Sequence, residues 1–234
     1  MPVAPSRPEP PENTHPMPSS PAAAPGLNGA AIDGDWYTSV TDLAHRTHWL
    51  NGPAFAWTSY GIAVFAVLLL AGWWLARGAD DRTMAAALFA PVAVALAYLV
   101  NDAVKSFFQE PRPCRALPHD FLIEPCPPAT DYAFPSNHTT VAFAVAAALF
   151  FVHRRLAAVT ALAAVLMGAS RVYVGAHYPH DVAVAALAGS CTALLTVLLA
   201  RRLGTPLVAA LRGGRLGPLL NAPAPRRHRR PRTP

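Results

Sequence analysis

The sequence SRVYVGAHYPHD, residues Ser170–Asp181, joins two strongly apolar segments and carries an arginine, histidines and an aspartate at the junction. Two further polar sequences, KSFFQEPRP (Lys105–Pro113) and FPSNHTT (Phe134–Thr140), also border apolar segments. Ionisable side chains at the ends of membrane helices are candidates for a functional site when they face the interior of a bundle. We therefore expect these three sequences to meet in one site at one face of a membrane.

The composition indicates a membrane protein. Of the 234 residues, 53% are hydrophobic and only 14% are charged. Soluble domains carry about a quarter charged residues. The mean hydropathy of +0.28 points the same way.

Five apolar segments approach the roughly 20 residues that a helix needs to span a bilayer. They are Pro53–Ala76, Thr83–Val104, Pro135–Val152, Leu156–Tyr173 and Asp181–Ala200. Burial in a soluble core is the alternative, but so many apolar helices in a chain of this size would leave little polar surface to face water. The predicted fold is an all-α, polytopic membrane bundle of about five transmembrane helices.

A different pattern precedes the first apolar segment. Residues 36–50 mix aromatic, apolar and polar side chains, and Trp36, Val40, Leu43 and Leu50 can share one face of a helix. This pattern predicts an N-terminal interfacial helix that lies on the membrane surface.

Both ends of the chain differ in composition from residues 35–203, which we assign as the membrane domain. Residues 1–34 are rich in proline and alanine and lack hydrophobic periodicity, which predicts a disordered tail. Residues 204–234 form a second tail that ends in RRHRRPRTP. Because it follows membrane helices, we assign this basic tail to the anionic cytoplasmic leaflet and expect no nucleic-acid partner.

The distribution of Lys and Arg predicts the orientation, because cytoplasmic loops carry an excess of these residues. The more basic side of the predicted bundle combines the C-terminal tail with Arg77, Arg82, Arg154, Arg155, Arg201 and Arg202. We therefore expect the C-terminus in the cytoplasm and the N-terminus outside the cell membrane. The three polar sequences then lie together on the extracytoplasmic face.

The cysteines offer one possible crosslink. Cys114 and Cys126 bracket a proline-rich part of the predicted outer loop, whereas Cys191 lies in the fifth apolar segment. A disulfide between Cys114 and Cys126 is expected if the loop faces an oxidising compartment. The alternative is two free thiols.

The polar sequences contain a set of groups suited to an oxyanion. Guanidinium groups bind the acceptors of a tetrahedral oxyanion in pairs, and the convergence of Lys105, Arg112 and Arg171 would suit a doubly charged phosphoryl group. Taken singly, each would be an ordinary interfacial cation. Ser136 adds a hydroxyl donor, and Asn137 adds a backbone N–H at a predicted helix start, where free N–H groups favour an anion.

Two histidines and an aspartate provide the reactive groups. His177 and Asp181 are four residues apart, a spacing that places both on one face of a helix. A carboxylate behind an imidazole fixes its tautomer and leaves the far nitrogen free to attack. We expect His177 to form a phosphohistidine, with Asp181 orienting it, while His138 protonates the leaving oxygen and then activates water.

No metal or other cofactor is required by this scheme, because positioning and charge stabilisation do most of the work in phosphoryl transfer. The alternative is a zinc ion bound by His138, His177, His180 and Asp181. The neighbouring cations oppose a metal charge, so we prefer the scheme without metal. The remaining histidines belong to no motif, and we assign them no role.

Together these residues resemble the type-2 phosphatidic acid phosphatase superfamily of membrane lipid phosphatases, whose pattern is K-x6-RP, then PSGH, then SR-x5-H-x3-D. The corresponding residues are Lys105 with Arg112–Pro113, then Pro135–His138, then Ser170–Arg171 with His177 and Asp181. Every spacing agrees. The one departure is Asn137, where the superfamily often has glycine, and this change keeps the backbone donor. The similarity covers about residues 36–202.

Within this superfamily, QEPRP, FPSNHTT and GASRVYVGAHYPHD look similar to bacterial undecaprenyl-diphosphate phosphatases of the bacitracin-resistance type. The resemblance implies a helical bundle with an outward-facing site that removes the terminal phosphate of a polyprenyl diphosphate and so recycles the cell-envelope lipid carrier. It places the nucleophile, the acid and base, and the phosphate-binding groups on the residues named above. Alternative substrates are phosphatidic acid, phosphatidylglycerophosphate and a decaprenyl-linked sugar phosphate. An alternative of another class is a non-catalytic lipid-binding scaffold.

Overall fold

The computed structural model describes residues 27–117 and 121–223, and every regular element within these residues is a helix. The helices are α1 (Gly29–Arg46), α2 (His48–Tyr60), α3 (Ile62–Ala76), α4 (Asp81–Phe108), α5 (Pro113–Ala116), α6 (Asn137–Leu149), α7 (Arg154–Tyr173), α8 (Pro179–Leu203), α9 (Thr205–Gly213) and α10 (Gly217–Leu220). The all-α fold is confirmed.

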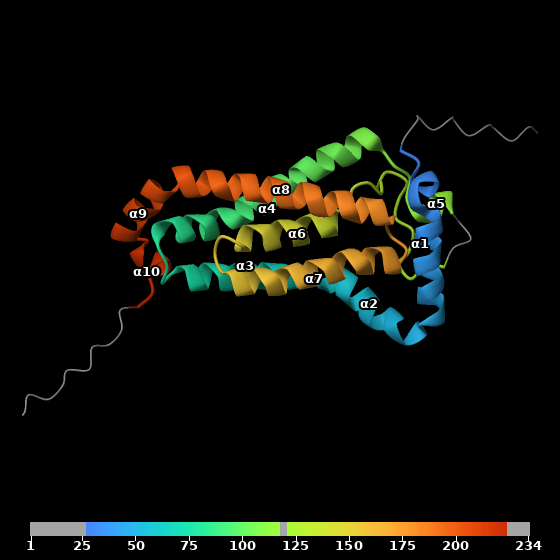
Figure 1. Cartoon of the computed structure of the whole chain (residues 1–234), viewed down its shortest axis with the longest axis horizontal. Helices are drawn as coiled ribbons and strands as arrows, with labels where there is room; N and C mark the ends of the chain where they lie inside the picture. The colour runs from blue at the N-terminus through green and yellow to red at the C-terminus, as the bar shows by residue number, and fades with distance from the viewer. Residues whose placement is uncertain (1–26, 118–120, 224–234) are drawn as a thin grey trace, which may run out of the picture.

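The long helices run side by side, and α1 lies across one end of the bundle (Figure 1). Helix α5 lies at the same end, whereas α9 and α10 lie at the opposite end. Figure 1 also shows that the three polar sequences all fall at the α1 end, where α4 and α7 finish and α6 and α8 begin.

Length and composition qualify three to four spans among the described residues, against the five apolar segments of the sequence. By length and composition, three helical segments can cross a membrane: Asp81–Ala116, α7 and α8. A fourth candidate is the pair α2 and α3, which is bent by 53°. The bend falls at Gly61, where an added Cβ would lie 2.4 Å from the carbonyl oxygen of Trp57.

Helix α6 is the main departure from the expected spans. Its 13 residues fall short of the roughly 20 that cross a bilayer. The sequence predicts a span over residues 135–152, but Pro135 and Ser136 precede the helix and residues 150–153 form a turn that leads into α7. Helix α6 is therefore an apolar helix that is enclosed by its neighbours.

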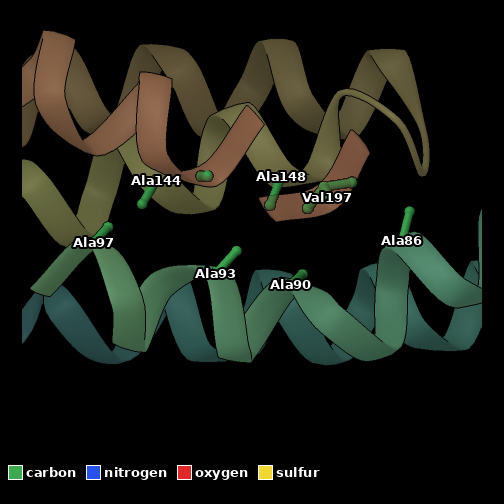
Figure 2. Packing of buried hydrophobic residues seen from close by; sticks show 8 residues of the cluster. Ala86, Ala90, Ala93, Ala97, Ala144, Ala148 and Val197 are labelled. Atoms are coloured by element: carbon green, nitrogen blue, oxygen red, sulfur yellow. The ribbon is translucent and has the colours of Figure 1, made fainter. Parts of the chain in front are cut away.

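Small residues bring the central helices together. Figure 2 shows the buried contact between α4, α6 and α8, formed by Ala86, Ala90, Ala93, Ala97, Ala144, Ala148, Ala193 and Val197. Membrane helices approach closely where their interface residues are small. The backbones of α6 and α8 approach closely at Gly189 of α8, where an added Cβ would lie 2.5 Å from the carbonyl oxygen of Thr140. This packing sets the start of α6 beside the start of α8.

The expected N-terminal boundaries need correction. Residues 29–34, which we assigned to a disordered tail, form the first turns of α1 because their side of the helix is anchored to the bundle through Asp33 and His180. The predicted interfacial helix over residues 36–50 ends earlier, at Arg46, and Thr47 separates it from α2. The rest of the predicted tail, residues 1–26, lies outside the described residues.

The C-terminal boundary differs in the same way. Residues 205–220, assigned to the basic tail, contain α9 and α10. Their apolar side chains explain the difference, because Val208 and Leu220 are buried against Met84 at the start of α4. Arg212 also forms an ion pair with Asp81, at 2.8 Å. Residues 224–234 lie outside the described part of the chain.

Candidate active site

A cavity of about 350 Å³ lies where the three polar sequences meet. It is lined by the three predicted cations and both predicted histidines: Lys105, Arg112, His138, Arg171 and His177. These residues come from α4, the start of α5, α6, α7 and the turn before α8. Folding thus brings together groups that are up to 72 positions apart in the sequence.

His177 is presented by a tight turn between α7 and α8. Gly175 adopts a φ of 83°, a left-handed conformation that glycine accepts without steric cost. The turn is fixed from two sides, since Tyr37 Oη donates to the carbonyl oxygen of Gly175 at 3.0 Å and Arg112 Nη1 donates to that of Ala176 at 2.9 Å. Both bonds go to main-chain oxygens, so the turn places His177 without any contact from its own imidazole.

Substituting Gly175 with alanine tests this turn. An added Cβ would lie 2.6 Å from Leu122 Cδ2 and 3.2 Å from Tyr37 Oη, at a positive φ. We expect a loss of roughly 1–3 kcal/mol in stability, together with a fall in kcat because His177 is displaced. Thermal unfolding and turnover in detergent would be measured together. Gly52, where an added Cβ meets nothing within 4 Å, provides the matched control, and equal behaviour of the two variants would contradict the role of the turn.

Asp181 holds the imidazole of His177 from behind. Asp181 Oδ2 lies 3.3 Å from His177 Nδ1 and also accepts the N–H of Tyr178 at 2.9 Å. The reason differs from the helical spacing that we expected, because α8 begins at Pro179 and His177 precedes it. The contact arises because Asp181 caps the start of α8 and turns its carboxylate back toward the preceding residues.

The far nitrogen of His177 faces the cavity cations. Arg112 Nη1 lies 2.9 Å from His177 Nε2, and because a guanidinium can only donate, this nitrogen is the acceptor and the proton sits on Nδ1. Burial and then the positive charge of Arg112 hold the pKa of His177 well below its usual 6.5. The imidazole is therefore neutral at physiological pH, with a lone pair on Nε2.

The cations are held by carboxylates of the loop between α5 and α6. Arg112 Nη2 lies 2.8 Å and Lys105 Nζ 3.6 Å from Asp131 Oδ1. Arg171 binds both carboxylate oxygens of Glu124, at 2.7 and 3.2 Å. Burial opposes the ionisation of Asp131, but the hydrogen bond and charge of Arg112 outweigh it and bring the pKa of Asp131 below its usual value.

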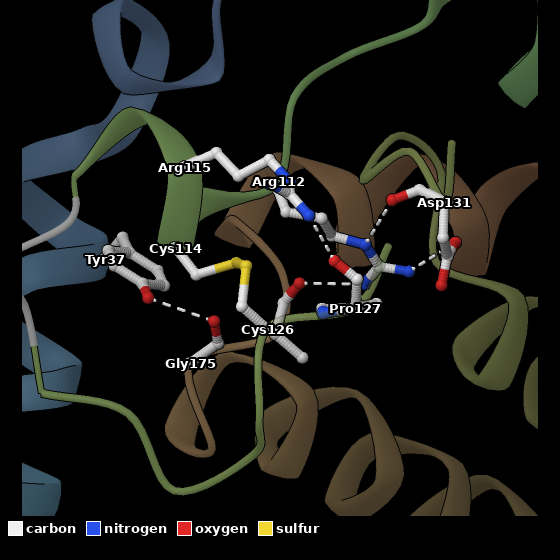
Figure 3. The surroundings of a disulfide bond; sticks show 9 residues. Tyr37, Arg112, Cys114, Arg115, Cys126, Pro127, Asp131 and Gly175 are labelled. Carbon is white, nitrogen blue, oxygen red and sulfur yellow. Dashed lines mark hydrogen bonds and ion pairs between the residues drawn. A yellow bond between two sulfur atoms is a disulfide. The ribbon is translucent and has the colours of Figure 1, made fainter. Parts of the chain in front are cut away.

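Sequence reasoning missed Asp131 and Glu124. Both lie in an irregular loop, where no periodicity indicates which way a side chain points. The same loop is joined to α5 by a disulfide between Cys114 and Cys126, as Figure 3 shows together with the contacts of Arg112 and Asp131. The disulfide thus ties α5 to the part of the loop around Cys126, whose neighbours Pro125 and Pro127 line the cavity.

The start of α6 carries His138 to the cavity wall, but it does not bring all three predicted groups there. The side chain of Asn137 lines the cavity and accepts a hydrogen bond from Asn101 Nδ2 at 2.6 Å. Ser136, predicted as a phosphate donor, is wholly buried. Its Oγ instead accepts the hydroxyl of Thr139, at 3.1 Å, so its side chain supports the helix start and does not line the cavity.

One group among the described residues has donor atoms spaced as in a metal site. These are atoms of Glu110, His180 and Asp181, all within 4.8 Å of one another. His138 and His177, which the alternative zinc site required, do not belong to this group. His180 and Asp181 belonged to the alternative zinc site, whereas Glu110 was not among the predicted residues.

Apolar helices around a cavity with three cations and two histidines define a membrane-embedded phosphatase. Residues 86–204 match the model of the PAP2 superfamily, about half of the chain, and the chain belongs to this superfamily. The resemblance seen in the sequence is thereby confirmed.

Curated relatives agree with this assignment. Undecaprenyl-diphosphatase BcrC of Bacillus subtilis (strain 168) is 32% identical over 146 residues, which make up 62% of this chain and 72% of the relative. The bacitracin transport permease protein BcrC of Bacillus licheniformis is 30% identical over 170 residues, or 72% of this chain and 81% of the relative. The crystal structure of Aquifex aeolicus LpxE shares the fold, with a TM-score of 0.52 and 23% identity over 71% of this chain and 95% of that one.

Proposed function

We propose that this membrane phosphatase removes the terminal phosphate of a polyprenyl diphosphate and so recycles a cell-envelope lipid carrier. The observation that carries the proposal is the placement of His177, whose Nε2 lies in the cavity lined by the three cations while Asp181 backs its Nδ1. The substrate class is supported by the names of two relatives, the undecaprenyl-diphosphatases of Bacillus subtilis and Sulfolobus acidocaldarius.

The first step forms a phosphohistidine. His177 Nε2 attacks the terminal phosphorus, the bond from phosphorus to the bridging oxygen breaks, and that oxygen takes a proton from His138. Burial and then the charge of Arg171 lower the pKa of His138 to about 4. The proton that His138 donates is therefore one that it gains when the negatively charged diphosphate binds beside it. Polyprenyl phosphate leaves, and the positive charge that develops on the imidazole is stabilised by Asp181 through Nδ1–H. Burial of Asp181, whose exposed fraction is 0%, strengthens this interaction, because a low local dielectric raises the energy between charges.

The second step releases phosphate. His138 takes a proton from water, the resulting oxygen attacks phosphorus, and the N–P bond breaks to restore neutral His177. Lys105, Arg112 and Arg171 hold the phosphoryl oxygens throughout, with backbone N–H groups at the start of α6 as further donors. In the structure, Asp131 and Glu124 accept hydrogen bonds from Arg112 and Arg171. Phosphoryl oxygens are anionic acceptors of the same kind, so the cations are already directed at positions suited to a phosphoryl group.

The proposed orientation places the cavity on the extracytoplasmic side of the cell membrane. It rests on the Lys/Arg distribution, because the end of the bundle opposite α1 carries Arg82, Arg201 and Arg202 around one surface cavity. The N-terminus is then outside and the C-terminus cytoplasmic. Catalysis belongs to the helical domain, which we place at residues 35–203 together with the first turns of α1.

Substrate assays would test the proposed function. Phosphate release by detergent-purified protein would be measured with undecaprenyl diphosphate, phosphatidic acid, phosphatidylglycerophosphate and a decaprenyl-linked sugar phosphate, with and without a chelator. We expect the highest kcat/KM with the diphosphate and no effect of the chelator. A preference for another lipid would change the substrate but keep the mechanism, whereas no turnover on any of them would favour a non-catalytic lipid-binding scaffold.

The pH dependence follows from His177. Because burial and Arg112 lower its pKa, the neutral, reactive form persists as the pH falls through 6.5 and is lost only well below that value. We expect no acid limb from this group in kcat/KM between pH 7.5 and 6. Rates would be corrected for substrate ionisation measured by ³¹P NMR. A limb with a midpoint at or above 6.5 in the corrected profile would contradict a neutral His177.

Substituting Lys105 with alanine tests the cation cradle. Lys105 Nζ donates to the carbonyl oxygen of Tyr132 at 2.8 Å and faces the cavity beside Asp131. We expect KM to rise about tenfold, as for the loss of a charge-assisted contact of roughly 1.5 kcal/mol. Arg46→Ala, at an exposed cation of α1, is the control. Unchanged KM and kcat in the Lys105 variant would remove this residue from the phosphate site.

A further inference from the structure

A second set of charged side chains contacts Asp181 through its other oxygen. Whereas Oδ2 faces His177 and the N–H of Tyr178, Oδ1 lies 3.4 Å from Nε2 of His180. The same Nε2 lies 3.2 Å from Oε2 of Glu110. His180 therefore bridges two carboxylates, and one of them belongs to the residue that backs the proposed nucleophile.

The other nitrogen of His180 is bound by a residue of α1. Asp33 Oδ1 lies 2.8 Å from His180 Nδ1, and Asp33 Oδ2 accepts the backbone N–H of His180 at 2.7 Å. Asp33 has non-helical backbone angles within α1 (φ −147°, ψ 30°), and this kink is where its carboxylate meets the start of α8. Both imidazole nitrogens thus face carboxylates, the arrangement of an imidazolium that donates from each side.

The ring of His180 is also fixed in its plane. It stacks on Phe134, at a centroid distance of 5.8 Å, and on Tyr178, at 5.7 Å, with interplanar angles of 27° and 19°. The faces of aromatic rings carry negative potential and attract cations. Stacking on two aromatic rings therefore suits a positively charged imidazole and helps to keep both N–H groups directed at their acceptors.

The position of Glu110 explains why a positive charge on His180 is needed to keep Asp181 ionised. Glu110 and Asp181 are both wholly buried, and donor atoms of both lie within the 4.8 Å group that includes His180. Two adjacent buried carboxylates cannot both ionise readily unless a cation separates them. A protonated Asp181 would accept the Nδ1–H of His177 weakly and would not stabilise the positive charge that develops on that ring.

From this geometry we infer that His180, anchored by Asp33, is a positioning residue that keeps Asp181 ionised and aimed at His177. The inference deepens the proposed function and rests on it. The charged groups that face His180 are Asp33 of α1, Glu110 after α4, and Asp181 of α8. Helix α1 thereby contributes to catalysis through a chain of ion pairs from Asp33 through His180 to Asp181. We call this chain the charge relay, although no proton moves along it and neither Asp33 nor His180 lines the cavity.

The test compares His180→Gln with wild type, using undecaprenyl diphosphate as substrate. Glutamine keeps a donor but carries no charge. We expect kcat to fall about 10- to 100-fold, the range seen when outer partners that orient metal-bound histidines are removed. We also expect KM to change less than twofold and the acid limb of kcat to move up by at least one pH unit. Asp33→Asn should also lower kcat and raise the pH of the acid limb, but by less than His180→Gln. Asp33→Glu, which keeps the carboxylate, should retain part of the kcat that Asp33→Asn loses.

Controls separate positioning from folding. His48→Gln changes an exposed histidine at the same end of the bundle and should match wild type. A uniform loss of activity across the pH range, with a lower unfolding temperature and no shift of the acid limb, would show a purely structural role and overturn the inference. So would an unchanged kcat and pH profile in His180→Gln.

Two further outcomes are distinguishable. If a chelator removes wild-type activity and zinc restores it, the Glu110, His180 and Asp181 group binds a metal, and the charge relay is wrong. His177→Ala is run in the same series. If that variant keeps ordinary turnover, the proposed function fails, whereas an inactive His177→Ala beside an unaffected His180→Gln would overturn the relay alone.

Discussion

Replacing His177 with alanine is expected to reduce turnover by at least roughly 10⁴-fold, because the variant has no group that can form the covalent intermediate. The backbone should remain in place. The turn that carries His177 is fixed by Tyr37, Gly175 and Arg112, through bonds to main-chain oxygens that do not involve the imidazole. Single-turnover and steady-state phosphate release would measure the effect.

The matched control for this substitution is His48→Ala, at an exposed histidine at the same end of the bundle. It should behave as wild type in expression, thermal stability and turnover. If His177→Ala retained ordinary turnover while remaining folded, the assignment of the nucleophile would be wrong, and His138 would become the candidate to test next.

Asp181→Asn should give the second largest loss, a fall in kcat on the order of 10³-fold with little change in KM. Asparagine nearly preserves shape and can still accept the N–H of Tyr178, which now binds Oδ2 at 2.9 Å. It cannot stabilise a charged imidazole, and its amide group can favour the wrong tautomer of His177. Folding should therefore survive while the phosphorylation step slows.

Asp102→Asn supplies the comparison, because Asp102 is an exposed carboxylate near the end of α4. Stopped-flow or quench measurements of the first turnover would show whether phosphorylation is the step affected. A variant of Asp181 with unchanged kcat, or with an effect confined to KM, would exclude the orienting role of this carboxylate.

Much of the fold was predictable because apolar length and composition are strong signals. The segments that became α4, α7 and α8 were found from these signals alone. Helix α6 was overextended, because an apolar run does not show where a polar helix start or a turn interrupts it. Residues 29–34 were assigned to the tail because the preceding sequence is rich in proline and alanine. Nothing in the local sequence indicates that Asp33 binds His180, and this contact anchors the start of α1.

Some residues of the candidate site could be predicted from the sequence and others could not. Lys105, Arg112 and Arg171 could be selected because each is an ionisable group at the end of an apolar segment, and the cavity brings them together. Asp131 and Glu124 could not, because they contact these cations from a loop without repeating pattern. His180 was considered only as a ligand of the alternative zinc site, since its partners Asp33 and Glu110 are 147 and 70 positions away.

The most direct test of the account is to trap the phosphorylated enzyme. Protein would be mixed with undecaprenyl diphosphate that carries ³²P in the terminal phosphate, quenched in alkaline detergent and digested, and the labelled peptide identified by mass spectrometry. The account predicts an acid-labile, alkali-stable label on His177 that forms and decays at catalytically competent rates. Turnover without any such label, or with the label on another residue, would contradict it.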